Sequence, residues 1–238
     1  MKVTLHALFL GTAVIGWLLT AAGPAQIVGE SAELERVLAQ MDAAARNFKA
    51  TEASFVTDQY YKVIKDIDES ARQKGKIYFR RERGETEMAA DFVEPEKRYV
   101  LYSGGKIQVY RYKIDEVDVY DPGKNRGDVE SYLVLGFGGR GHDLLKSYEV
   151  KFLGSETANG VTAEKLELIP KSDRFRNIFA RIWLWIDPAR GISVQQQFFE
   201  PSGDYRLAKY SEIQTDAKIP EDVFKLKTTK RTKFVPQG

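Results

Sequence analysis

The sequence predicts a mainly β protein of the α+β class: an unclosed antiparallel β-barrel with an N-terminal helix and a short helical insert that acts as a lid over an apolar cavity. Three observations lead to this prediction. The spacing of apolar residues is helical up to Ala50 and then changes to a period of two. Short turns of the hairpin type separate the extended segments. One stretch, residues 121–147, interrupts the strands once.

The first 25 residues have the features of a secretory signal peptide. Lys2 gives a positive start, residues 8–19 form an apolar run, and small residues follow up to Ala25. The run is shorter than the ~20 apolar residues that a membrane-spanning helix needs. We therefore expect cleavage after Ala22 or Ala25, a periplasmic location, and a single domain over residues 26–238. An uncleaved N-terminal anchor is the alternative.

Charge and composition argue against several functions. The 36 Lys and Arg residues are balanced by 34 Asp and Glu residues interleaved with them, so no nucleic-acid partner is expected. The chain has no Cys and only two His, His6 and His142. A nucleophile–base–acid triad and a typical His/Cys zinc site both need more residues of these kinds. We therefore expect neither an enzyme nor a bound metal or cofactor.

An amphipathic helix is expected between Ser31, a candidate N-cap, and Phe48. Its apolar stripe recurs at steps of three and four residues and consists of Leu34, Val37, Leu38, Met41, Ala45 and Phe48. A helix with one apolar stripe packs that stripe on a neighbouring element, here the sheet.

About eleven strands are expected after the helix, in the order of a meander. They cover residues 53–64, 75–81, 87–93, 99–103, 107–112, 116–120, 148–153, 163–169, 180–187, 193–200 and 205–215, and a last short strand is expected around Phe224 and Leu226. Turn residues of the hairpin type, such as Asn159-Gly160, lie between them. A twisted sheet of this size curls or closes.

Several strands are apolar on both faces. Ile182, Leu184 and Ile186 occupy one phase of a strand, and Trp183 and Trp185 the other. An antiparallel strand with one wet face alternates instead. The second face is therefore covered by the protein's own core and helix, or it lines a cavity wide enough for acyl chains. The candidate lining residues are Phe55, Ile77, Phe79, Tyr99, Leu101, Val109, Val150, Phe152, Leu166, Leu168, Leu184, Ile186 and Phe198.

The interruption at 121–147 is interpreted as two short helices, around residues 128–135 and 142–146, joined by a glycine-rich hinge. A helical insert of this kind can cover the open end of a barrel. Its candidate lid residues are Leu133, Leu135, Gly136, Phe137, Gly138 and Gly139.

Arg81 is the candidate latch of this lid. It shares a strand face with Ile77 and Phe79, so it points inward if they do. An inward guanidinium is costly unless it is paired or hydrogen-bonded, and backbone carbonyls of the insert are possible partners. On spacing alone, a position at the strand end with the side chain in solvent is equally compatible.

The order of these elements resembles the LolA family of periplasmic lipoprotein carriers. The resemblance rests on Ala53-Ser54-Phe55, the Gly-x-φ-x-φ-x-Arg pattern at 75–81, the turn ending in Gly105-Lys106, and later stretches up to residues 219–224. Arg81 falls on the arginine that bonds to the lid in that family. Glu82 follows where those proteins usually have Pro, and Arg80 is the alternative at the latch position.

The resemblance implies a function as well as a fold. It implies a monomeric carrier that accepts acyl chains of lipoproteins or related lipids from an inner-membrane transporter and passes them to an outer-membrane receptor. A lipid- or lipoprotein-sensing regulatory module of the cell envelope on the same fold is the alternative.

Overall fold

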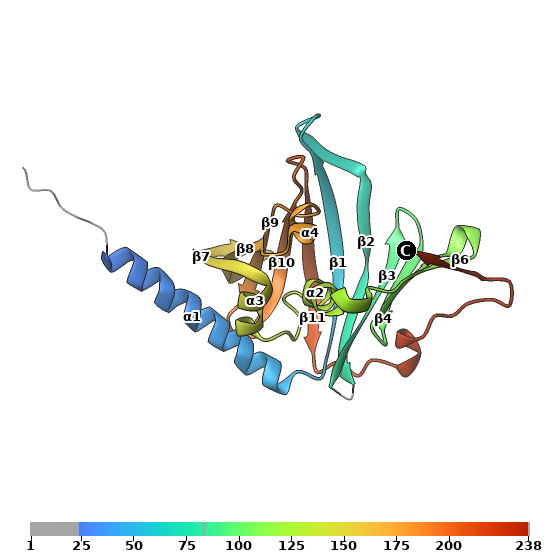
Figure 1. The fold of residues 1–238 in the computed structure, drawn as a ribbon, viewed down its shortest axis with the longest axis horizontal. Helices are drawn as coiled ribbons and strands as arrows, with labels where there is room; N and C mark the ends of the chain where they lie inside the picture. Colours follow the sequence, from blue (N-terminus) through green and yellow to red (C-terminus); the bar gives the residue numbers. More distant parts are fainter. Residues whose placement is uncertain (1–23, 83, 238) are drawn as a thin grey trace, which may run out of the picture.

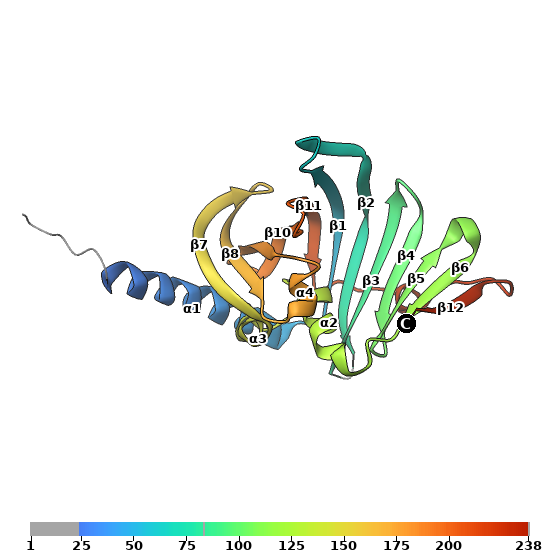
Figure 2. The ribbon, with the colours of Figure 1, turned by 45° about the horizontal axis from the view of Figure 1, so that its top comes forward.

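A computed structural model describes residues 24–82 and 84–237, which form one curved sheet with helices against its concave face (Figures 1 and 2). The predicted signal peptide, apart from its last two residues, lies outside the described part. The strands are β1 (Ala50–Tyr61), β2 (Asp66–Glu82), β3 (Glu85–Glu94), β4 (Arg98–Ser103), β5 (Lys106–Arg111), β6 (Glu116–Tyr120), β7 (Tyr148–Ala158), β8 (Val161–Pro170), β9 (Arg181–Asp187), β10 (Ile192–Phe199), β11 (Tyr205–Thr215) and β12 (Lys233–Gln237). The helices are α1 (Pro24–Asn47), α2 (Arg126–Leu133), α3 (Gly141–Ser147) and α4 (Asp173–Arg176), with short 3-10 helices η1 (Tyr112–Ile114), η2 (Gly123–Asn125) and η3 (Glu221–Phe224).

The sheet is built from two meanders. Its twelve described strands follow the order β12-β6-β5-β4-β3-β2-β1-β11-β10-β9-β8-β7, so β1 pairs with β11 where the two meanders meet. The last strand, β12, pairs parallel with β6. The predicted meander, interrupted once by a helical insert, is confirmed, and the insert divides it into β1–β6 and β7–β11. The expected short strand near Phe224 is corrected to the 3-10 helix η3.

This topology explains where the insert runs. Strand β6 lies near one edge of the sheet and β7 forms the opposite edge, so the connection between them must cross from one side of the molecule to the other (Figure 2). It does so over the concave face, where Leu135 and Phe137 are buried against the strands. We call residues 126–147, which comprise α2, the turn at 134–140 and α3, the lid.

Helix α1 covers one part of the concave face with the apolar stripe that the sequence predicts. Val37, Leu38 and Met41 are at most 1% exposed and pack with Leu166 and Leu168 of β8. The helix begins at Pro24, seven residues before the expected start at Ser31. Among the described residues, no helix has the length and apolarity needed to cross a membrane.

The convex face has a cover of its own. Residues 216–232, which we call the C-terminal arm, run across the outer side of β2, β3 and β4 (Figure 1). Phe224 of the arm is buried against Ala89 and Leu101. The same strands are therefore covered on both faces, by the lid inside and the arm outside, which explains why both phases of their sequences are apolar.

Candidate functional site

The turn of the lid inserts apolar side chains into the middle of the barrel. Phe137 is 1% exposed, and its ring stacks on Phe79 of β2 with the centroids 4.5 Å apart. It also meets Tyr210 of β11 edge to face at 4.8 Å. Leu135, two residues earlier, joins the cluster under α1. The lid therefore fills space between the two meanders rather than only covering it.

Two glycines give the turn its shape. Gly136 and Gly138 have φ values of +75° and +74°, in the left-handed region that glycine adopts most readily. A Cβ atom at Gly138 would lie 2.5 Å from the ring of Phe48, and one at Gly136 would lie 2.5 Å from Ser193 Cβ. These two glycines let the backbone turn inward and approach the wall closely. Gly139 has no such crowding. Whether the three act as a hinge stays a prediction.

Polar groups of the barrel wall form hydrogen bonds with the backbone of the turn. The side chain of Gln196 in β10 donates from Nε2 to the carbonyl oxygen of Leu135 at 2.6 Å. The hydroxyl of Tyr210 donates to Oε1 of the same glutamine at 2.9 Å. The backbone N–H of Ser193 donates to the carbonyl of Gly136 at 2.8 Å. The sequence analysis missed Gln196 and Tyr210, because β10 contains three consecutive glutamines and the sequence does not show which of them is buried.

Arg81 points to the concave face and joins the lid to helix α1. Its Nη2 donates to the carbonyl oxygen of Gly138 at 2.7 Å, and its Nη1 donates to that of Ala45 at 2.9 Å. The guanidinium carbon lies 5.5 Å from the centroid of Phe48. Arg80 points to the opposite face and contacts the C-terminal arm. Of the two neighbouring arginines, Arg81 is therefore the one that contacts the lid.

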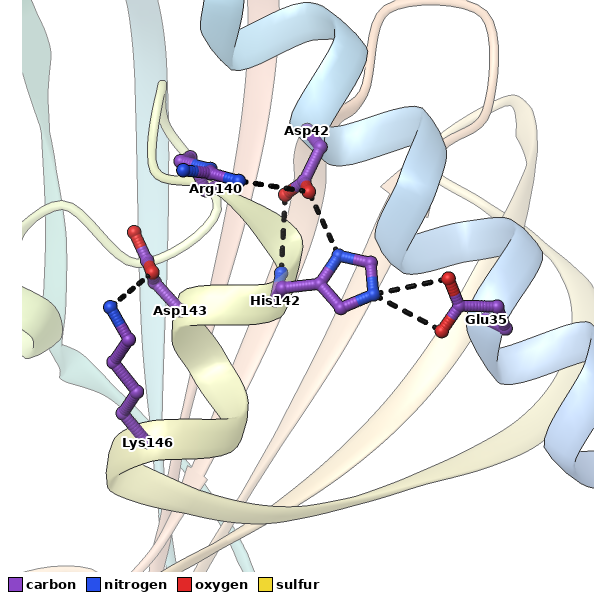
Figure 3. Close-up of polar contacts among 6 residues, drawn as sticks. All are labelled: Glu35, Asp42, Arg140, His142, Asp143 and Lys146. Carbon is purple, nitrogen blue, oxygen red and sulfur yellow. Dashed lines mark hydrogen bonds and ion pairs between the residues drawn. The ribbon is translucent and has the colours of Figure 1, made fainter.

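A second contact between lid and helix centres on His142, at the start of α3 (Figure 3). Its Nδ1 lies 2.8 Å from Asp42 Oδ2, and its Nε2 lies 3.1 Å from both oxygens of Glu35. Its backbone N–H donates to Asp42 Oδ1 at 3.2 Å. Asp42 and Glu35 both belong to α1. We call this group of contacts the histidine clasp.

The clasp favours a charged imidazole. Hydrogen bonds to Asp42 and then to Glu35 raise the pKa of His142 above its ordinary value of 6.5, against a smaller opposing effect of burial. For Asp42, burial alone would raise the pKa, but the hydrogen bonds and the charge of His142 together lower it. The sequence analysis assigned His142 no role, and the structure places it between the lid and α1.

Other charges around the clasp are partly paired with each other. Arg140 lies 3.6 Å from Asp42. Lys146 pairs with Asp143 at 2.7 Å on the outer side of α3 (Figure 3). The ring of His142 thus faces two carboxylates of α1, with one arginine nearby.

The concave face is filled in this structure. Apolar side chains of the strands, α1 and the lid form two buried clusters there. An open space of about 640 Å³ lies between the lid and α1 and is lined by charged residues such as Arg46, Arg81 and Glu130 as well as by apolar ones such as Met41 and Val134. The space expected for an apolar cavity under the lid is therefore occupied in this structure by side chains of the lid and α1.

Most of the candidate lining residues lie on the concave face, in the two buried clusters or packed against them. These are Phe55, Ile77, Phe79, Val150, Phe152, Leu166, Leu168, Leu184, Ile186 and Phe198. Val109 lies directly opposite Val100, which packs on the concave cluster, and so has the same orientation. Leu133 of the lid also packs on that cluster.

Tyr99 and Leu101 are the exceptions. They lie on the convex face under the C-terminal arm, and Val100 and Tyr102 take the inner positions of β4. The prediction placed this strand one residue out of phase, which reverses the face of every side chain. Neither residue lines the concave side.

Comparison with known proteins identifies the fold. No family model and no curated protein matches the sequence. An uncharacterized conserved protein from Thermus thermophilus has a similar structure, with 12% identity, 86% of this chain and 99% of that chain covered, and a TM-score of 0.55. MucB matches with 15% identity over 82% of this chain and a TM-score of 0.51.

A LolA superfamily protein from Nitrosomonas europaea also matches, with 11% identity, 81% of this chain and 97% of that chain covered, and a TM-score of 0.41. The match to MucB spans 63% of the MucB chain, which is less than two thirds of its length. At these identities a likeness shows the fold alone. The unclosed antiparallel sheet with a helical lid that the sequence predicts is confirmed by the structure, and its fold is similar to those of the Thermus thermophilus protein and MucB.

Proposed function

We propose that this chain binds acyl chains of lipoproteins or related lipids on the concave face of its barrel and carries them through the periplasm towards the outer membrane. One observation carries the proposal: the lid side chains Leu135 and Phe137 are buried in the two apolar clusters of the concave face, against side chains of the strands. If the lid moves outward, Phe79 and Tyr210 lose their contact with Phe137 and become a surface for apolar cargo.

The closed lid explains how such a carrier releases its cargo. Each buried methylene group of an acyl chain is worth about 0.8 kcal/mol, so several long chains in an open barrel would be held very tightly. Leu135 and Phe137 compete with cargo for the same space, and their own burial opposes binding. The binding free energy of cargo is then the free energy of acyl-chain burial in the open state minus the free energy of lid closure. This smaller net value makes transfer to an acceptor possible.

Arg81 sets that balance in the proposal. It bonds to carbonyl oxygens of the lid and of α1, and the bond to Gly138 of the lid must break when the lid moves away. Charge-assisted hydrogen bonds contribute about 1.5–3 kcal/mol each in favourable cases. The donor in this scheme is an inner-membrane transporter and the acceptor an outer-membrane receptor, as in the family that the sequence resembles.

A regulatory binding module is the second candidate. MucB, which shares this fold, has been crystallised in complex with MucA, its partner in Pseudomonas aeruginosa. A chain of this kind would sense lipid or lipoprotein on the concave face and change its contact with a protein partner. Native mass spectrometry of protein purified from its own envelope separates the two: bound lipid or lipopeptide supports the carrier, and empty protein bound to a protein partner supports the sensor.

The carrier proposal is tested with Arg81→Leu and its neighbour Arg80→Leu as the matched control. We expect Arg81→Leu to bind a fluorescent fatty-acid probe about tenfold more tightly and to pass it to acceptor vesicles more slowly, because a loss of about 1.4 kcal/mol from the closed state is a tenfold change. Arg80→Leu should leave both unchanged, since Arg80 contacts the arm. If neither the natural chain nor Arg81→Leu binds the probe, the proposal is wrong.

A further inference from the structure

A pocket of about 240 Å³ lies on the convex face, on the opposite side of the sheet from the lid. It is enclosed by β2, β3 and β4 below and by the C-terminal arm above. Tyr78, Tyr99 and Tyr112 line it together with Asp91 and three lysines, and Asp222 and Val223 of the arm complete the lining. Neither the resemblance nor the proposed function uses this pocket.

Asp91 is the unusual member of this lining. It lies in β3, where its direct neighbours across the sheet are Lys76 of β2 and Tyr99 of β4. Its Oδ1 atom is buried and has no hydrogen-bond partner in the described part of the chain. A buried carboxylate oxygen without a hydrogen-bond donor is costly, because it has lost its contact with water and gained none in return. This position therefore favours a ligand that brings a donor and a positive charge.

Three tyrosines surround this carboxylate. Burial, and next the negative charge of Asp91, raise the pKa of Tyr99; burial also raises the pKa of Tyr78 and Tyr112, and the charge of Asp91 adds to both. The same anion thus acts on three phenol groups from three different elements. A carboxylate among aromatic rings is the environment that binds ammonium groups, through ion pairing and the attraction of a cation to a ring.

The lysines of the lining favour an anionic group on the ligand. Lys97 Nζ lies 4.9 Å from the ring centroid of Tyr112, and Lys225 and Lys227 come from the arm. Lys227 pairs with Asp222 at 2.6 Å. A ligand with an ammonium group alone would be repelled by these lysines. An anion alone would be repelled by Asp91.

We propose that this pocket binds a small zwitterion, with a primary ammonium group on Asp91 among the tyrosines and a phosphate or carboxylate group on Lys97 and Lys225. A primary ammonium is favoured over a quaternary one because its N–H bonds give Asp91 Oδ1 the donor that it lacks. The volume corresponds to roughly eight water molecules at ~30 Å³ each, which suits an aminoalkyl phosphate or an amino acid.

The test uses O-phosphoethanolamine and two analogues, with binding followed by calorimetry. Phosphocholine keeps the positive charge but has no N–H group, and n-propyl phosphate has neither. We expect O-phosphoethanolamine to bind at least tenfold more tightly than n-propyl phosphate, with phosphocholine between them. Equal binding of O-phosphoethanolamine and n-propyl phosphate, or no binding of O-phosphoethanolamine, would overturn the proposal.

The variant Asp91→Asn keeps the shape of the side chain and removes its charge. It should reduce the affinity for O-phosphoethanolamine at least tenfold and leave that for n-propyl phosphate equal or higher. Glu94→Gln is the matched control, because Glu94 lies at the end of the same strand and pairs with Lys74 instead. If Asp91→Asn binds O-phosphoethanolamine as the natural chain does, the carboxylate is not the ammonium site and the proposal fails.

The same chemistry is offered by a phosphatidylethanolamine headgroup and by a free zwitterion. Flotation on phosphatidylcholine vesicles with and without phosphatidylethanolamine separates them. Association that needs phosphatidylethanolamine and is lost in Asp91→Asn identifies the headgroup as the source. Calorimetric binding of O-phosphoethanolamine without such association identifies a free compound. Because Asp91 lies on the face away from the lid, neither result depends on acyl chains in the barrel.

Discussion

Two neighbouring arginines of β2 hold the covers of the two faces of the barrel, and they do so by different means. Arg81 reaches the lid and α1 through two neutral backbone carbonyls. Arg80 reaches the convex side, where it pairs with Glu87 at 2.6 Å and Glu221 at 2.7 Å. Its guanidinium carbon also lies 4.2 Å from the ring centroid of Phe224.

This difference indicates which of the two covers can move away from the sheet. When Arg81 leaves its carbonyls, neutral groups are left behind, and water or cargo can replace their partner at a moderate cost. When Arg80 leaves, Glu87 and Glu221 lose a partner that also neutralises their charge, and Glu87 is 14% exposed in its side chain. We therefore interpret the arm as a fixed part of the fold and the lid as the part that exchanges.

The largest expected effect is on the convex side. Phe224→Ala should lower the free energy of unfolding by about 3 kcal/mol, because truncation of a buried phenylalanine costs ~3–5 kcal/mol in a core that cannot collapse. Chemical denaturation measures the loss. The fatty-acid probe should bind to this variant as it does to the natural chain, since the concave face is untouched.

Phe137→Ala is the matched change on the concave side. Phe137 is 1% exposed and Phe224 is 5% exposed. If the lid opens while the rest of the barrel stays folded, truncation of Phe137 can lower the free energy of unfolding by no more than the free energy of lid closure. We expect a smaller loss of global stability than in Phe224→Ala, together with tighter binding of the probe. If Phe137→Ala costs as much as Phe224→Ala and binds no probe, the lid is an ordinary part of the core.

A pH dependence of the closed lid is the next effect in size. The pKa of His142 is raised in the folded protein, mainly by Asp42, so the clasp contributes its full stability below about pH 6.5 and loses it as the pH rises through the higher folded value. Asp42 has a lowered pKa, so its own contribution is lost only when the pH falls below its ordinary value of 3.8. The lid is therefore held most firmly between these limits.

Because the side chain of His142 is 36% exposed, solvent screening keeps the effect below about 1 kcal/mol. We expect the probe to bind up to about fivefold more tightly at pH 8.5 than at pH 5.5. The ratio should disappear in His142→Gln. A binding constant that changes equally in the natural chain and in this variant would place the pH dependence elsewhere.

The sequence was sufficient to predict the concave face where one phase of a strand is apolar over its whole length. It was insufficient in residues 99–102, where both phases are apolar and burial under the arm and burial under the lid give the same signal. The first half of β2, residues 66–74, was missed for the opposite reason, since it is polar and pairs with β1 beyond the core. The parallel pairing of β12 with β6 left no local signal in the sequence.

The contacts of the candidate site show the same limit. Arg81 was a candidate because it continues the phase of Ile77 and Phe79, although a position at the strand end with the side chain in solvent fitted the spacing equally well. The histidine clasp was not, because Asp42 and Glu35 are separated from His142 by 100 and 107 residues. Only the packing of α3 on α1 brings these side chains together.

The smallest expected effect tests which carboxylate of the clasp matters. Glu35 is 64% exposed in its side chain and Asp42 is 12% exposed. Glu35→Gln should therefore change the affinity for the probe by less than about twofold, a few tenths of a kcal/mol, as for other exposed pairs. Asp42→Asn should have the larger effect because Asp42 also accepts the backbone N–H of His142 and lies beside Arg140. Probe titrations of both variants at pH 5.5 measure the difference. Equal effects would mean that the clasp acts only through the net charge of α1, and its geometry would then play no part in holding the lid.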